Sequence, residues 1–437
     1  MRGNQVRVFL TVIGLGLACG YAAFAQSGAP TVGGIGPAAA GNPPAAAPAS
    51  GAQAAGGQAA NAATAPPPPI TAPFRIHVIA DNIAGGYALL TVDLNKDHKT
   101  DIVAIGLQST SLVWYENPYW IPHVITTQAQ KMVAMDYADL DGDGIPEIAV
   151  AYDFAAIPKN SVGTVSIFKH NGDPRQPWDL MKTMDNHLPS THRVNFANVD
   201  GKGHGTLVAA PILAPGSPGF PDPDHLSVQL WAYRMENDWK PELITDQNKG
   251  VVHGLLPYDF FGTGKQDILT AGYSGINAHT REKDGTWKRT FIAEGSPAPW
   301  PGGGAGHVVV GKLAGKQFFA TIEPFHGNMV VIYTQDEKGA YQRHVIDDVL
   351  TNGHAMTLVD VDSDGMQEVV AGGSRTKANL FFYRATDKTG QNWTKQLMDN
   401  NMQASGCMPA DIKGTGHKTD VVCIGAQYVK WYEYLGK

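Results

Sequence analysis

Seven copies of one unit fill the sequence from about residue 74 to the C-terminus. Each copy has an apolar strand, a turn rich in Asp and Gly, a second apolar strand and a third strand with aromatic residues, as MDYADLDGDGIPEIAVAY begins. Equivalent turn positions follow at 46, 59, 61, 53, 48 and 51 residues, and they are Asp93, Asp139, Asn198, Asp259, Lys312, Asp360 and Asp411. Periods near 40 to 50 residues with four strands each are typical of propeller blades. The sequence therefore predicts an all-β chain that forms a single seven-bladed β-propeller with four-stranded blades.

The two ends of the repeat region complement each other. The last repeat ends after its third strand, whereas FRIHVIAD (Phe74 to Asp81), before the first repeat, has the pattern of a fourth strand. We expect this N-terminal strand to complete the last blade and close the ring, which leaves no open sheet edge. The low share of charged residues, 17%, and the abundance of Gly (50) and Pro (29) agree with short strands joined by tight turns.

The first 72 residues differ in composition from the repeat region. A short basic and apolar stretch ends in an Ala-x-Ala site at Ala25, and the following residues are nearly all Ala, Gly, Pro, Ser and Gln. This predicts a signal peptide over residues 1–25, cleaved after Ala25, a disordered linker over 26–72 and the propeller over 73–437. We expect a periplasmic or secreted protein with no transmembrane segment in the mature chain.

The net charge bears on the expected binding partner, and the cysteine content bears on disulfide bonding. The formal net charge is −7 and no run of Lys and Arg occurs, so nucleic acid is not an expected partner. After cleavage only Cys407 and Cys423 remain, at facing positions of one predicted hairpin. A disulfide bond and a pair of buried thiols fit this pattern equally well. The oligomeric state is left open.

Three turns carry oxygen-bearing side chains at positions 1, 3, 5 and 9. The sets are Asp93, Asn95, Asp97 and Asp101; Asp139, Asp141, Asp143 and Glu147; and Asp360, Asp362, Asp364 and Glu368. Such oxygens can wrap a hard cation where Gly lets the backbone bend. Asp and Gly are also good turn formers without a cation. Because the full set occurs three times, we interpret these turns as structural calcium sites.

Histidines recur at the opposite end of the first strand. Counting back eight residues from the third position of the turn, held by Asp200, Phe261 and Asp362, gives His192, His253 and His354. Allowing one deleted residue adds His307, and the first repeat has Tyr87. The second strands of the fifth and sixth repeats end on the same face with Glu323, His326 and Arg375. Because the repeat is radial, these side chains should converge on the propeller axis.

Converging imidazoles suit two kinds of chemistry. They can bind a transition metal such as zinc, for which His253, His307, His326 and His354 are the candidate ligands, with Glu323 beside them. They can also transfer protons near neutral pH without a metal. Tyr87 and Trp300 are candidate substrate contacts, since Trp300 lies in a long connection expected on this face and a Trp ring can stack on a sugar.

Two family resemblances give these residues a function. The D-x-D-x-D-G-x-x-[DE] hairpins resemble the FG-GAP or VCBS repeats of integrin-like propellers. WYENP, GHVVVGKL, IEPFHGNMVVIY and NGHAMTLVDVDSDG resemble the propeller domain of fungal aldos-2-ulose dehydratase and its bacterial relatives, chiefly between residues 252 and 373. This resemblance implies a carbohydrate dehydratase or related lyase acting on a keto-sugar or anhydro-sugar. The metal would polarise the carbonyl, His192 would take the α-proton, and the other histidines, Glu323 and Arg375 would complete the catalytic site.

Two alternatives belong to other classes. The first is a non-catalytic propeller that binds an extracellular polysaccharide or protein on the same face. The second is a lyase or hydrolase acting on acidic polysaccharide, which would use Lys131, Arg193 and Arg375. The sequence has no G-x-S-x-G, H-E-x-x-H or phosphate-loop motif, which disfavours serine hydrolases, zincins and nucleotide enzymes.

Overall fold

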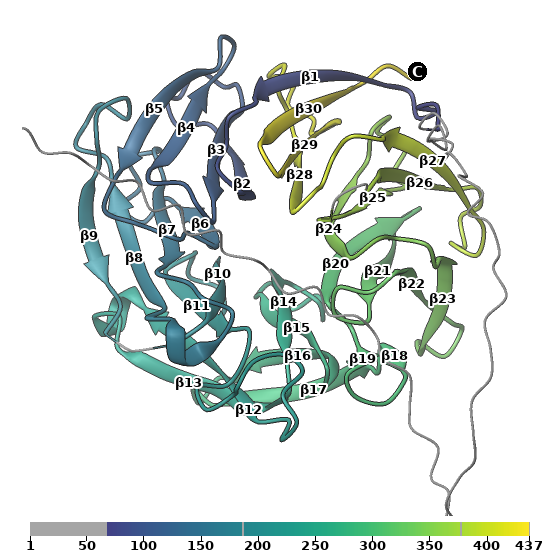
Figure 1. The fold of residues 1–437 in the computed structure, drawn as a ribbon. Helices are drawn as coiled ribbons and strands as arrows, with labels where there is room; N and C mark the ends of the chain where they lie inside the picture. Colours follow the sequence, from purple (N-terminus) through teal and green to yellow (C-terminus); the bar gives the residue numbers. More distant parts are fainter. Residues whose placement is uncertain (1–67, 186–187, 376–377, 437) are drawn as a thin grey trace, which may run out of the picture. The chain divides into compact units, whose positions relative to one another are not determined.

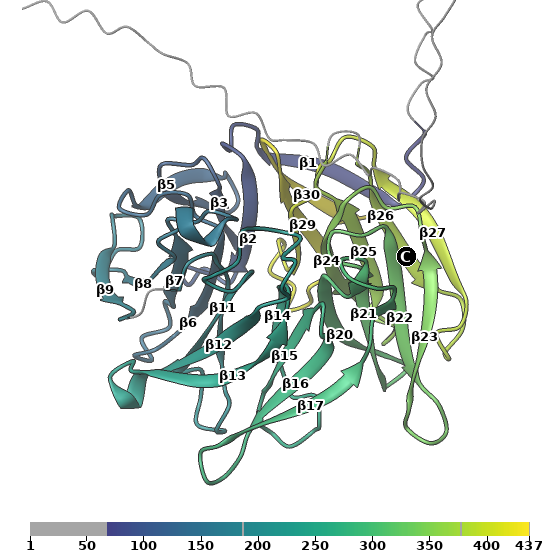
Figure 2. The same cartoon turned by 60° about the horizontal axis from the view of Figure 1, so that its bottom comes forward.

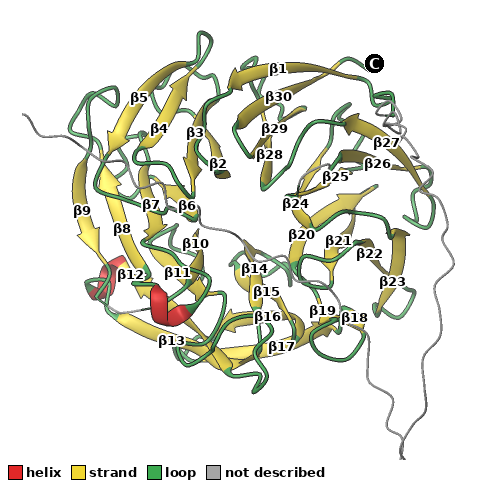
Figure 3. Ribbon diagram, viewed as in Figure 1, coloured by secondary structure: helices red, strands yellow, loops and turns green. Residues whose placement is uncertain are grey.

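Seven four-stranded antiparallel sheets form a ring of blades in the computed structural model, which describes residues 68–185, 188–375 and 378–436 (Figures 1 and 3). The predicted seven-bladed propeller is thereby confirmed. Within the described ranges, no helix is long and apolar enough to cross a membrane. The signal peptide, its cleavage after Ala25 and the linker up to residue 67 lie outside the described residues and stay predictions.

Each of the first three blades uses consecutive strands from the axis outward (Figure 1). The first blade contains β2 (Gly86–Val92), β3 (Asp101–Gly106), β4 (Leu112–Glu116) and β5 (Ile121–Thr126). The second contains β6 (Ala134–Ala138), β7 (Glu147–Tyr152), β8 (Thr164–Lys169) and β9 (Asp179–Thr183), with the short helix η1 (Pro158–Asn160). The third contains β10 (Thr191–Ala197), β11 (Thr206–Pro211), β12 (Ser227–Arg234) and β13 (Pro241–Lys249), with η2 (Met235–Asn237).

The next three blades repeat this order. The fourth contains β14 (Val252–Tyr258), β15 (Asp267–Gly272), β16 (Gly275–Arg281) and β17 (Trp287–Ala293), followed by the small hairpin β18 (Ser296–Pro297) and β19 (Gly303–Gly304). The fifth contains β20 (His307–Leu313), β21 (Lys316–Glu323), β22 (Met329–Gln335) and β23 (Tyr341–Asp347). The sixth contains β24 (Gly353–Val359), β25 (Glu368–Gly373), β26 (Leu380–Ala385) and β27 (Trp393–Asp399).

The seventh blade joins the two ends of the described chain. It consists of β28 (Gly406–Ala410), β29 (Asp420–Gly425), β30 (Tyr428–Tyr434) and, on its outer edge, β1 (Phe74–Ala80). Figures 1 and 2 show β1 alongside β30, and Phe74 pairs with Tyr434 in the register. Cys407 and Cys423 face each other across β28 and β29 and form a disulfide bond. The N-terminal strand therefore closes the ring as predicted.

The core lies between adjacent blades. Leu90, Val103 and Trp114 of the first blade pack with Ile148 and Phe168 of the second, and all five are almost completely buried. The second strand of a blade, such as β3, β15 or β25, is buried along its whole length because neighbouring blades cover both of its faces, whereas an outer strand such as β9 is largely exposed. This packing fixes how the seven inner strands are placed around the axis, and so it determines which side chains meet there.

His279 in β16 gives the fold a specific acid sensitivity. The side chain is fully buried in the fourth blade, and its Nε2 lies 3.1 Å from the Thr270 hydroxyl. Burial, aided by the charge of Arg289, lowers the pKa of His279 from 6.5 to about 3. The unfolded chain therefore binds the proton first as the pH falls below 6.5. The stability contributed by the neutral ring is present above pH 6.5 and is lost progressively toward about pH 3.

We expect acid to destabilise the His279→Gln variant less than it destabilises the wild type. In the wild type, the buried ring should lower the free energy of unfolding by about 2 kcal/mol at pH 5 relative to pH 7.5. Each pH unit below 6.5 contributes about 1.4 kcal/mol. Urea unfolding midpoints at the two pH values check this, with the exposed His204→Gln as the matched control. An identical pH dependence in His279→Gln and the wild type would contradict it.

Candidate functional site

Four inner strands contain a β-bulge at the same place. The register of β2, β10, β14 and β24 shifts across Tyr87, His192, His253 and His354. A bulge takes one residue out of the hydrogen-bonded ladder and re-aims its side chain. The same local irregularity thus presents one tyrosine and three histidines from four different blades.

These four side chains meet on the propeller axis. The Tyr87 hydroxyl lies 2.7 Å from Nε2 of His192 and 3.1 Å from Nε2 of His354, which belong to the third and sixth blades. The ring centroids of His192 and His253 are 4.7 Å apart, and those of His253 and His354 are 5.0 Å apart. The convergence predicted from the repeat is therefore present for these residues.

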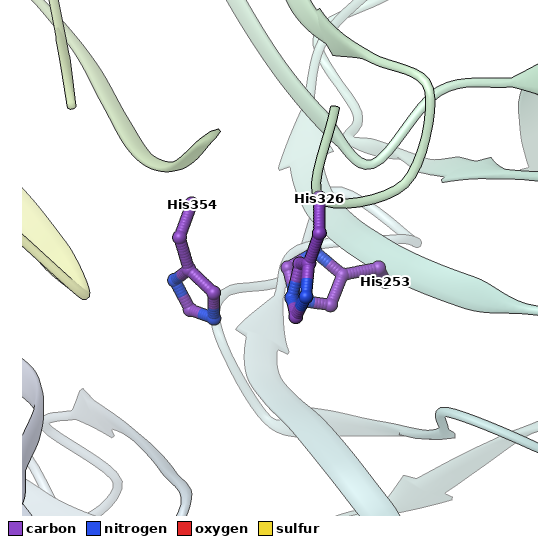
Figure 4. A group of neighbouring side chains, drawn as sticks. All are labelled: His253, His326 and His354. Carbon is purple, nitrogen blue, oxygen red and sulfur yellow. The ribbon is translucent and has the colours of Figure 1, made fainter. Parts of the chain in front are cut away.

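His326 joins them from the loop between β21 and β22. Its ring centroid lies 4.9 Å from that of His253 and 5.0 Å from that of His354. The ligand nitrogens of His253, His326 and His354 all lie within 4.8 Å of one another, and Figure 4 shows the three imidazoles gathered from two sides. We call these three side chains the histidine triad.

Backbone carbonyls orient two rings of the triad. The Nδ1 of His253 lies 2.5 Å from the Gly306 carbonyl oxygen, and the Nδ1 of His354 lies 2.6 Å from that of Ser405. A carbonyl can only accept, so each Nδ1 carries the proton and each Nε2 carries a lone pair. In the structure these lone pairs face donors, the Tyr87 hydroxyl at His354 and Nη2 of Arg193 at His253. Nε2 of His326 is buried without a hydrogen-bond partner among the described residues. A carbonyl on the far nitrogen is the usual outer support of a metal-ligating histidine.

Burial keeps the triad neutral. It lowers the pKa of His253 and His326 well below 6.5 and that of His354 to about 4, and the positive charge of Arg193 acts in the same direction. The neutral imidazole is the form that binds a metal. In a tetrahedral zinc site, ligand nitrogens lie about 3.3 Å apart, so the triad would have to contract around an ion. The donor set fits a transition metal.

His307 is placed differently from the other three repeat histidines. It begins β20 in regular register opposite Ile322, with no bulge, and it lines the axial cavity below the triad. Burial lowers its pKa to about 3. The fifth repeat is one residue shorter than the others at this point because its inner strand lacks the bulged residue. His307 is not part of the described metal-binding group, and His326 of the same blade takes that place.

The structure also separates Glu323 from the histidines. Its carboxylate is fully buried in the fifth blade and accepts hydrogen bonds from Arg343 at 2.6 and 2.9 Å, from the Tyr333 hydroxyl at 2.8 Å and from the Thr321 hydroxyl at 2.7 Å. With both oxygens engaged, this carboxylate is not directed to the triad. Its surroundings indicate a structural role instead of the predicted role in the catalytic site.

Arg375 lies on the same side as the triad. The side chain is exposed, and its charge contributes to lowering the pKa of His326. His192 is not a member of the triad, but its Nε2 is bonded to Tyr87 and its Nδ1 is buried without a partner in the described part of the chain. These positions suit one charged and one proton-exchanging group beside a metal.

Trp300 belongs to an aromatic group that leads to the triad. Its ring centroid lies 5.3 Å from that of Phe220, which in turn lies 4.8 Å from that of Phe325. Phe325 stacks on His326 at 4.0 Å and lies 5.0 Å from His253. Two long connections, residues 211–225 and 295–306, therefore meet through Phe220 and Trp300. Phe325 was not identified from the sequence, although it lies in the quoted EPFH motif.

The acidic turns lie at the other end of the inner strands. Asp139, Asp141 and Glu147 form one candidate metal group with ligand atoms within 4.8 Å, and Asp360, Asp362 and Asp364 form another. The first turn has Asn95 at its third position. All three turns are closed by their first residue, whose carboxylate accepts a backbone N–H five residues later from His98, Gly144 or Gly365.

Basic side chains contact two of these acidic groups. Lys169 pairs with Asp141 and lies 3.6 Å from Glu147. Arg384 lies 3.1 Å from Asp362 and 3.0 Å from Glu368. A calcium ion would compete with these cations for the carboxylates, so the turns are candidate metal sites whose charge is already partly balanced.

We expect calcium to stabilise the wild type and the Asp141→Asn/Asp362→Asn variant to lose most of this effect. A ligand at 100 times its dissociation constant stabilises the folded state by about 2.7 kcal/mol. Thermal unfolding with calcium and after chelation measures the gain, and Asp246→Asn, at an exposed position outside the turns, is the control. An unfolding temperature that calcium leaves unchanged in the wild type would refute the calcium interpretation.

Comparisons with known proteins agree with this architecture. The family model of the aldos-2-ulose dehydratase β-propeller domain matches residues 162–336, which contain His192, His253, His307 and His326. The model of the FG-GAP-like repeat matches residues 93–150, which contain the first two acidic turns. A comparison with curated proteins finds no match.

Solved structures share the fold at low sequence identity. The extracellular domain of a candidate one-component system from B. thetaiotaomicron is 9% identical, with a TM-score of 0.50, over 82% of this chain and 39% of that chain. A candidate 6-phosphogluconolactonase from Bacteroides fragilis is 12% identical (TM-score 0.49; 78% and 87% covered). A lectin from Agrocybe aegerita that recognises non-reducing terminal N-acetylglucosamine is 15% identical (TM-score 0.47; 81% and 87% covered).

The two family matches bear out the resemblances seen in the sequence. They cover different parts of the propeller, and the larger one includes two members of the triad, His253 and His326. Residues 162–336 are thus similar to the β-propeller domain of aldos-2-ulose dehydratase, and residues 93–150 are similar to an FG-GAP-like repeat.

Proposed function

We propose that the histidine triad binds a divalent transition metal such as zinc, and that the site removes water from a keto-sugar or an anhydro-sugar. The observation that carries this proposal is the convergence of three neutral imidazoles, two of them with the Nδ1 proton held by a carbonyl and the third with a buried Nε2 that has no partner among the described residues. The match to the aldos-2-ulose dehydratase propeller domain supports the reaction class. The metal, when bound by His253, His326 and His354, supplies a Lewis acid for the sugar carbonyl.

His192 and Tyr87 are placed to move the proton. The Tyr87 hydroxyl and Nε2 of His192 are 2.7 Å apart, so a proton can pass between them directly. In the proposed elimination the α-carbon of the sugar loses its proton to this pair, and the electron pair left behind is delocalised onto the carbonyl as an enolate. This electron pair then forms the carbon–carbon double bond as the bond between the β-carbon and its hydroxyl oxygen breaks, and the hydroxyl leaves as water with the proton returned by the pair. Arg375 lies near enough for its charge to act on His326, and this positive charge would stabilise the negative charge that develops on the sugar.

The aromatic group beside the triad is the proposed sugar-binding surface. Phe220, Trp300 and Phe325 are partly exposed and follow one another toward His326. Aromatic rings beside a polar centre suit a ligand with one apolar face. We also propose that the protein is exported and works in the periplasm or outside the cell, because the Cys407–Cys423 disulfide is typical of an oxidising compartment.

Turnover of keto-sugars and anhydro-sugars by the metal-loaded protein tests this function. We expect the ultraviolet absorbance of an unsaturated ketone to rise with the wild type. We expect at least a 100-fold lower rate with His192→Ala, since general-base catalysis contributes about 10² to 10⁴. The exposed His204→Ala is the matched control. Binding of these sugars without turnover would instead favour a carbohydrate-binding propeller, and neither binding nor turnover would reject both.

A further inference from the structure

The axial channel contains a cavity of about 190 Å³ directly below the triad. Its wall is mostly apolar, with side chains such as Leu89, Met135, Leu255 and Met356 from four blades. Tyr87 and Arg193 are also in the wall, and Arg193 is the only charged residue among the described residues that line the cavity. The cavity, which is partly open to solvent, thus presents one cation beside apolar side chains.

Arg193 has no carboxylate partner within the described ranges. Its Nη1 donates to the His192 carbonyl oxygen at 3.1 Å, and its Nη2 lies 3.5 Å from Nε2 of His253. Tyr87 interacts with the guanidinium as well and opposes the lowering of the pKa of Arg193 by burial. None of these partners is formally negative. The buried carboxylate of Glu323, by contrast, is paired with Arg343 within its blade.

A half-buried guanidinium without an anion is costly, because the apolar side chains beside it displace part of the water that would otherwise stabilise the charge. The guanidinium presents five N–H donors, and the contacts above do not use all of them. Its planar fork matches the two oxygens of a carboxylate, and an apolar wall strengthens such a pair. The missing negative charge is therefore expected to come from a ligand in the cavity.

We propose that the axial cavity is a binding site for a small carboxylate, held by Arg193 and flanked by the apolar side chains of the wall. The cavity volume limits the ligand to a short carboxylic acid or to the carboxylate end of a longer one, and a hydroxyl on the ligand would find Tyr87 and Ser405 in the same wall. This proposal does not depend on the proposed metal or on sugar dehydration, since Arg193 and the cavity belong to the protein alone.

Calorimetric titration of the metal-free protein with lactate tests this site. Lactamide has the same shape and no charge, so it is the neutral probe. At constant ionic strength we expect lactate to bind with a dissociation constant near or below about 1 mM and lactamide not to bind in this range. Arg193→Gln should weaken lactate binding at least tenfold, and Arg193→Lys should retain part of it. Arg75→Gln, which removes an exposed arginine from the outer strand β1, should have no effect.

Three outcomes would overturn the proposal. They are equal binding of lactate and lactamide, undiminished lactate binding by Arg193→Gln, and lactate binding that requires added metal, which would point to the triad. Circular dichroism and the urea midpoint of Arg193→Gln establish that the variant is folded, and Arg193→Lys tests the charge if it is not. Because the titration uses metal-free protein, a protein that binds no metal and turns over no sugar leaves its outcome unaffected.

Discussion

The His326→Ala variant is expected to lose the transition metal that the wild type retains after purification and dialysis. Removing one of three protein ligands should lower the metal affinity by more than about 100-fold, since loss of a supporting group alone costs 10- to 100-fold. Nε2 of His326 is buried and has no other partner among the described residues, so the metal is the group that would satisfy it. Elemental analysis of the purified proteins gives the metal content directly.

His307→Ala is the matched control for this result. His307 occupies the equivalent repeat position, is also buried and neutral, and lies outside the triad. We expect this variant to keep its transition metal, and both variants to keep calcium bound at the acidic turns. Equal metal loss in the two variants would mean that the triad is not the binding site. A wild type with no transition metal after loading would reject the metal site altogether.

The Glu323→Ala variant should lose about 3 to 5 kcal/mol of stability, the usual cost of breaking a buried ion pair by removing one partner. The change leaves the Arg343 guanidinium and the Tyr333 and Thr321 hydroxyls without their shared acceptor inside the fifth blade. The midpoint of urea unfolding is the measurement. Glu337→Ala, at an exposed position of the same blade, should stay within about 0.5 kcal/mol of the wild type.

The same variant distinguishes a structural residue from a metal ligand. If Glu323→Ala is folded at low temperature, we expect its transition-metal content to match that of the wild type. Loss of the metal from folded Glu323→Ala, with little change in the urea midpoint, would contradict the structural role and restore Glu323 to the site.

The repeat pattern was sufficient to predict most of the fold. Alternating apolar strands and Asp/Gly turns at a regular period are local features, and ring closure followed from counting strands at the two ends. The same counting found Tyr87, His192, His253 and His354, because residues at one repeat position face one axis in a radial fold. These parts of the prediction needed only sequence spacing and the symmetry of the architecture.

The membership of the site depended on features that spacing does not encode. A single bulged residue decides whether a side chain at the start of an inner strand turns toward its neighbours or stays in the ladder. His307, which has no bulge, is therefore not in the described metal-binding group, whereas the other three candidate ligands His253, His326 and His354 are. Glu323 precedes His326 by only three residues, yet Arg343 from the neighbouring strand β23 holds its carboxylate inside the blade.

The sequence by itself thus determined the blade number, the closing strand and the face on which histidines gather, since these follow from local periodicity. Only the tertiary structure decided which imidazole nitrogens carry the proton, which carboxylate is neutralised and that Arg193 has no described anionic partner. Those properties depend on contacts between blades that are distant in the sequence, such as the Gly306 and Ser405 carbonyls that orient His253 and His354 from adjacent blades.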